Sequence, residues 1–97
     1  MIKKILHKKK ILGLIIQPNK FKKKGVFFTS PNNFTKQVGI INYPKNHLIK
    51  PHTHKKYLRK IYRTSEVLFI QKGQLRVDFY KNNKKYLFSE IVKSNEI

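Results

Sequence analysis

The sequence predicts an all-β fold built from antiparallel strands. Prolines at positions 18, 31, 44 and 51 interrupt any long helix. Between them lie short apolar runs rich in Ile, Val, Phe and Tyr, which are typical of strands separated by turns. No apolar stripe with helical spacing is sustained over three turns. With 97 residues, the chain is expected to form one domain, residues 1–97.

The first half of the chain holds three of the expected strands, at residues 11–17, 25–29 and 37–43. Residues 1–24 form a basic N-terminal segment, in which lysine clusters at 8–10 and 22–24 bracket the first apolar run. We expect His7, within this segment, to be solvated. Residues 57–62 are expected to form a short turn of helix.

The second half predicts a three-stranded meander over residues 66–92. Residues 66–70 form a continuous apolar run after Glu66, which favours a strand buried on both faces. Gly73 then supplies a turn residue that is free to adopt positive φ. Residues 74–80 alternate apolar and polar side chains, as in a strand with one buried face. A turn at residues 82–83 precedes the last expected strand, residues 85–92.

Charge and composition bear on partners and location. The formal net charge of +19 would suit nucleic acid, but the excess consists of twenty Lys and only three Arg. Arg is the better residue for forked contacts with phosphates and bases, so a Lys-rich solvated surface is the preferred interpretation, and nucleic-acid binding is kept as an alternative. There is no cysteine for disulfides or thiolate metal sites. The apolar stretches are too short for a signal peptide or a membrane span, so we expect a cytoplasmic protein.

Three residues form a candidate metal-ligand set: His52, His54 and Glu66. If the segment after Pro51 is extended, side chains two residues apart project to the same side, which brings the two imidazoles together. Imidazoles suit divalent transition metals, and a carboxylate is a common additional ligand. A His-x-His pair alone is a weak motif, and both histidines at ordinary surface positions remain an alternative. An ion pair between Glu66 and a Lys or Arg is a further alternative to metal binding.

A second spacing strengthens the metal interpretation, because six residues separate Glu66 from Gly73. With Gly39, His52 and His54, this pattern resembles the first motif of the cupin superfamily, and the resemblance covers residues 37–92. It implies an antiparallel double-stranded β-helix, or jelly-roll, barrel. It also implies a divalent transition metal (Fe, Mn, Ni or Zn) held by His52, His54 and Glu66.

The chain departs from the cupin pattern in three places. Gly39 lies farther before His52 than is usual, and residues 55–65 form an insertion that is expected to bulge as a loop. The second cupin motif, with its fourth ligand histidine, has no counterpart, because no histidine follows His54. The expectation is therefore a cupin barrel that is incomplete at its C-terminus, with weak metal affinity and little or no catalytic activity.

The insertion is similar to those of small cupins encoded among bacterial polysaccharide genes. That likeness implies descent from an enzyme modifying a sugar or nucleotide-sugar, and Arg59 and Arg63 would suit an anionic substrate. Unpaired strand edges and apolar side chains such as Val67 and Phe69 favour a homodimer. Two other functions stay open: a small basic nucleic-acid-binding protein, and a non-catalytic binding or assembly module with a vestigial metal site.

Overall fold

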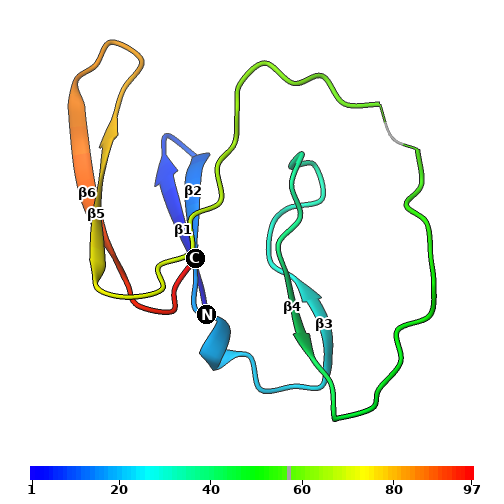
Figure 1. Cartoon of the computed structure of the whole chain (residues 1–97). Coiled ribbons are helices and arrows are strands. Elements are labelled where there is room, and N and C mark those ends of the chain that lie inside the picture. The colour runs from blue at the N-terminus through cyan, green and yellow to red at the C-terminus, as the bar shows by residue number, and fades with distance from the viewer. Residues whose placement is uncertain (57) are drawn as a thin grey trace. The chain divides into compact units, whose positions relative to one another are not determined.

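The computed structural model describes residues 1–56 and 58–97. Within these residues, each strand pairs with one neighbour, and all three pairs are antiparallel (Figure 1). The all-β, antiparallel prediction is confirmed, and the described strands do not close into a barrel. The elements are β1 (Ile2–His7), β2 (Lys10–Ile16), the 3-10 helix η1 (Pro18–Lys20), β3 (Gly25–Phe28), β4 (Gly39–Asn42), β5 (Gln74–Tyr80) and β6 (Tyr86–Lys93).

Five of the six strands were predicted, with ends that differ by three residues or fewer. Two predictions were wrong. Residues 66–70 form no strand, and residues 58–62 form no helical turn, while residue 57 lies outside the described part of the chain. The side chains of Val67 and Phe69 are 50% and 57% exposed, so this apolar run is not buried as expected.

Strand β1 was not predicted, because the sequence places it in the basic N-terminal segment. It pairs with β2 from Ile2 opposite Ile16 to His7 opposite Lys10, with an irregularity between Ile5 and Leu6. The connecting residues, Lys8 and Lys9, both have positive φ, at 48° and 63°. Two successive positive φ values are typical of a type I′ hairpin turn, which Asn and Gly normally occupy. A pair of lysines therefore gives no sequence signal for this hairpin.

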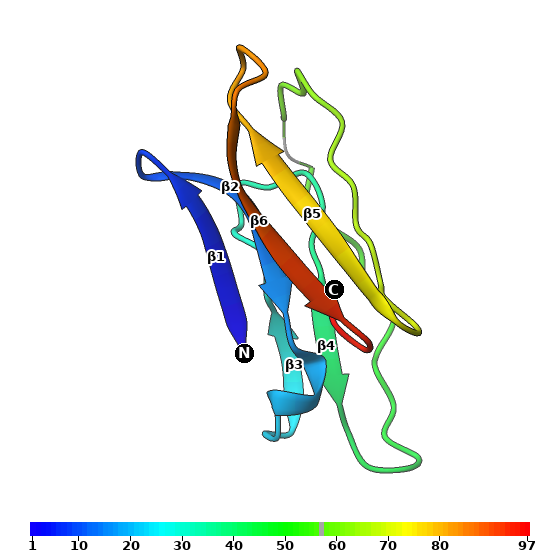
Figure 2. The same cartoon turned by 90° about the vertical axis from the view of Figure 1, so that its left-hand side faces the viewer.

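The chain divides into two compact units, of which the first contains Met1–Phe21 and Val67–Ile97. Its hairpins, β1–β2 and β5–β6, lie side by side (Figure 2) and enclose a small apolar core. The buried members of this core are Ile5, Ile15 and Val92. The partly buried side chains that pack against them are Leu12, Ile70, Val77, Phe79 and Phe88. Burial of these groups removes apolar surface from water and is the main force that holds the hairpins together.

The two ends of the chain are tied into the first unit by backbone hydrogen bonds. Ile16 and Ile97 exchange two such bonds, with N···O distances of 2.7 and 3.0 Å. The Gln17 N–H donates to the carbonyl of Met1 at 2.8 Å. Ile70 is bonded to the segment after β6, because its N–H donates to Glu96 O and its carbonyl accepts from Asn95 N. Ile70 is thus the one residue of the predicted strand 66–70 for which backbone pairing is recorded among the described residues.

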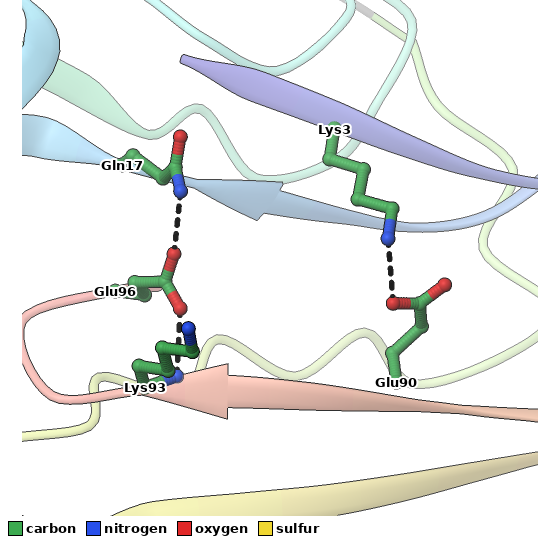
Figure 3. A network of polar contacts seen from close by, with 5 residues as sticks. All are labelled: Lys3, Gln17, Glu90, Lys93 and Glu96. Atoms are coloured by element: carbon green, nitrogen blue, oxygen red, sulfur yellow. Dashed lines mark hydrogen bonds and ion pairs between the residues drawn. The ribbon is translucent and has the colours of Figure 1, made fainter.

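Polar side chains reinforce these backbone ties (Figure 3). The Lys3 ammonium group forms an ion pair with Glu90 at 2.7 Å, which joins β1 to β6. The Glu96 carboxylate accepts hydrogen bonds from the backbone N–H of Lys93 at 2.7 Å and from Gln17 Nε2 at 2.9 Å. These two bonds lower the pKa of Glu96 below its ordinary value, because both stabilise the ionised carboxylate.

The second unit contains Lys22–Glu66. Its hairpin β3–β4 aligns Gly25 with Asn42 and Phe28 with Gly39. The loop of this hairpin is held by Thr29, whose N–H and hydroxyl both donate to the carbonyl of Val38. Thr29 is buried despite being polar, and these bonds satisfy it. The single domain expected over residues 1–97 stays a prediction, because the division into two compact units does not test it.

Gly73 has a φ of 84°, as the turn prediction required. A side chain at this position would meet open space, so backbone conformation alone favours glycine there. Among the described residues, no helix is long and apolar enough to cross a membrane.

Candidate functional site

His52 and His54 lie in a segment without regular secondary structure, and both side chains are exposed. Their ring centres are 5.5 Å apart, and the ring planes make an angle of 71°. The expectation that the two imidazoles lie together is confirmed.

The hydrogen bond of His52 determines which of its nitrogens is free. Its Nδ1 lies 3.1 Å from the carbonyl oxygen of Lys50. A carbonyl only accepts, so Nδ1 carries the proton, and Nε2 of the neutral ring keeps a free lone pair. In metal sites the non-ligating ring nitrogen commonly donates to a carbonyl in this way, which fixes the tautomer and the ring orientation.

The separation of the two rings can be compared with the separation expected for two imidazoles bound to one metal ion. Nitrogens about 2.0–2.1 Å from a tetrahedral ion, each about 1.1 Å from its ring centre, place the ring centres about 5.2 Å apart. The observed separation is 5.5 Å, with the two rings in edge contact. The ring-centre spacing is thus close to that of two ligands of one tetrahedral ion.

Glu66 is not brought to the histidine pair. Within the described residues, no group of three or more His, Cys, Asp or Glu side chains is placed to hold a metal ion. Glu66 is exposed, and residues 66–70 form no strand that could align it with the histidine segment. The insertion 55–65 separates the two in sequence, and its described residues form no helix or strand. The three-ligand set thus stays a prediction, of which the structure assembles two members.

The proposed substrate contacts also lie in the insertion. Arg59 and Arg63 are both exposed, in a stretch without regular structure. One side-chain contact anchors the end of this stretch, because Lys36 Nζ donates to the carbonyl of Ser65. The assignment of Arg59 and Arg63 to an anionic substrate stays a prediction.

Tyr43 and His47 form a second aromatic contact in the same unit. Their rings are stacked, with centres 3.7 Å apart and planes 8° from parallel. This stacking gives His47 a local structural role, and it makes His47 a natural control for experiments on His52 and His54.

The first unit also contains a cavity that was not predicted from the sequence. It lies where the ends of β1–β2 and β5–β6 come together. His7 lines it and is half-buried, whereas the sequence placed His7 in a solvated tail. The cavity combines residues about seventy positions apart, so no local pattern could have indicated it.

Comparisons with known protein families, curated proteins and solved structures found no match to this chain. The resemblance to cupins therefore rests on the residues named above: Gly39, His52, His54, Glu66 and Gly73.

Proposed function

We propose that this chain is a metal-binding protein of cupin ancestry, which captures a divalent transition metal (Fe, Mn, Ni or Zn) through His52 and His54. Two observations support the proposal: the rings lie at a separation that suits two ligands of one ion, and the Lys50 carbonyl fixes the His52 tautomer that leaves Nε2 free. The two observations are independent, since one concerns ring spacing and the other proton placement.

Glu66 is the proposed third ligand, and it has to move to the pair. Closing the loop over the eleven residues 55–65 costs about 2 kcal/mol or more in chain entropy. This cost weakens a three-ligand site relative to one held on paired strands. We therefore propose weak metal affinity and a binding role, with little or no catalysis by this chain.

The resemblance to sugar-modifying and nucleotide-sugar-modifying cupins suggests the ligand class. A metal held by the histidines would supply Lewis acidity to an oxygen of a sugar or another small polar molecule. Arg59 and Arg63 are proposed to attract the anionic part of such a ligand, since both guanidinium groups belong to the exposed insertion. We also propose a homodimer that covers exposed apolar side chains such as Phe69. Light scattering would measure the mass of this dimer.

Metal titration of the purified chain tests the proposal. Calorimetry with Zn²⁺ or Ni²⁺ should give one ion per chain, and the double variant His52→Ala, His54→Ala should lose this binding. His47→Ala is the matched control, because it removes a neighbouring exposed imidazole and should retain the binding. Unchanged affinity in the double variant, or no binding by the parent chain, would refute the metal proposal.

The variant Glu66→Gln separates two versions of the same site. A drop in affinity would indicate that the carboxylate joins the pair in the bound state, although the described residues of the free chain form no three-ligand group. Unchanged affinity would indicate a two-histidine site and a vestigial Glu66, as in a non-catalytic binding module.

Nucleic-acid binding is the second candidate, and one observation favours it. All twenty lysine side chains are exposed. Such a surface predicts binding that weakens steeply as salt rises, because phosphate contacts release counterions. It also predicts that the double histidine variant binds as well as the parent. Anisotropy titrations of a fluorescent oligonucleotide at two salt concentrations measure both properties.

A further inference from the structure

The cavity in the first unit has a volume of about 330 Å³ and opens at the turn end of the two hairpins. This volume is near the lower end of the roughly 300–1,000 Å³ that is typical of small-molecule sites. It would hold one compact ligand. The residues that line the cavity are distant in sequence from His52 and His54. Neither histidine lines it, so a ligand in this cavity would not depend on the proposed metal site.

The cavity has apolar side chains from both hairpins. Leu12 comes from β2 and Leu87 from β6, and each is half-buried. Tyr80, at the end of β5, lines the same space, and its ring meets that of Tyr86 edge-on, with centres 5.8 Å apart. An aromatic ring in the lining can contact a flat apolar group of a ligand. The interior therefore favours a flat apolar group.

The rim of the cavity is basic. Lys10 begins β2 and Lys81 follows β5, and both line the cavity together with His7. No carboxylate is among the lining residues. The described part of the chain records no ion pair for Lys10 or Lys81.

The acidic residues of this unit are engaged elsewhere. Asp78 pairs with Arg76 at 2.8 Å, Glu90 pairs with Lys3, and Glu96 accepts from Gln17 and Lys93. Hydrogen bonds from Ser89 and Arg76 lower the pKa of Asp78, in keeping with a carboxylate that is already satisfied. An anion from solution would be the first partner of the two lysines.

We propose that this cavity binds a small organic phosphate with a flat apolar body, of mononucleotide size. Lys10 and Lys81 attract the phosphate, and Leu12, Leu87 and Tyr80 contact the flat group. A lysine ammonium group can bind a phosphate as a point charge, without the planar fork of an arginine. No arginine lines the cavity.

Isothermal titration with adenosine monophosphate tests the proposal, with adenosine and inorganic phosphate as partial ligands. The parent chain should bind the nucleotide more tightly than either part, because both halves of the cavity contribute. The double variant Lys10→Gln, Lys81→Gln should lose tenfold or more in affinity. The control Lys22→Gln, Lys24→Gln removes the same charge from the other unit and should change affinity less than threefold.

Three results would overturn the proposal: no nucleotide binding at millimolar concentration, equal losses in both double variants, or equal affinity for nucleotide and inorganic phosphate. Equal losses would mean that the net charge, and not the cavity, attracts the anion. All four lysines are exposed, so circular dichroism should show the parent fold in each variant. An oligonucleotide with a 5′-phosphate forms a further arm. If the cavity variant weakens its binding and the control does not, the phosphate site is supported, and the ligand source is a nucleic-acid end.

Discussion

Replacement of Ile5 by alanine should destabilise the first unit more than any matched change at its surface. Ile5 is 3% exposed and belongs to the core cluster with Ile15 and Val92. The substitution removes three carbon atoms, which at about 0.8 kcal/mol per buried methylene amounts to about 2.4 kcal/mol. A cavity contribution raises the loss to about 3 kcal/mol, near the low end for such changes, since the partly exposed neighbours can relax.

Ile91→Ala is the matched control, because it removes the same atoms from the same unit at a side chain that is 45% exposed. Its expected loss is about 1.3 kcal/mol, with no cavity. Urea denaturation followed by circular dichroism measures both. With a slope of about 1–2 kcal/mol per molar, 3 kcal/mol lowers the midpoint by about 1.5–3 M. Equal losses for the two variants would refute the placement of the core between the hairpins.

Two further predictions concern the ties around this core. The pKa of Glu96 is lowered in the folded chain from an ordinary value of 4.5, so its stabilising contribution is present above that pH and is lost as pH falls through the lower folded pKa. Melting temperatures between pH 7 and pH 3 should therefore fall less in Glu96→Gln than in the parent, and parallel curves would contradict the role of the bonds from Lys93 and Gln17. The double change Lys8→Asn, Lys9→Gly should stabilise the chain by about 1 kcal/mol, because it relieves two positive φ angles. Urea denaturation that shows no gain would contradict that turn conformation.

The sequence predicted strands well where side-chain alternation and turn residues agreed. Residues 74–80 alternate, a turn at 82–83 follows, and β5 and β6 form as expected. The strand predicted from the apolar run 66–70 was wrong, because apolar content favours burial but does not supply a partner strand for the backbone. β5 and β6 pair with each other, and among the described residues 66–70 only Ile70 has backbone partners, in the segment after β6.

The candidate site was predictable to the extent that it is local. The proximity of His52 and His54 follows from their spacing and from Pro51, and the ring contact bears it out. The position of Glu66 depends on the path of eleven intervening residues, whose described members form no helix or strand. The apolar run predicted a strand at residues 66–70 that would have carried Glu66 beside the histidine segment, and the chain forms no strand there.

The first unit is assembled from both ends of the chain, with Lys22–Glu66 between its two parts. On a ribosome this sets an order of events, because β1 and β2 emerge well before the strands that cover Ile5 and Ile15. Synthesis of the 45 residues from 22 to 66 takes roughly 2–9 s, during which the first hairpin has no apolar partner. The nascent hairpin would then be a natural client for chaperones that hold exposed apolar segments. The clusters of lysine around it, at residues 8–10 and 22–24, would act as gatekeepers that keep neighbouring nascent chains from aggregating.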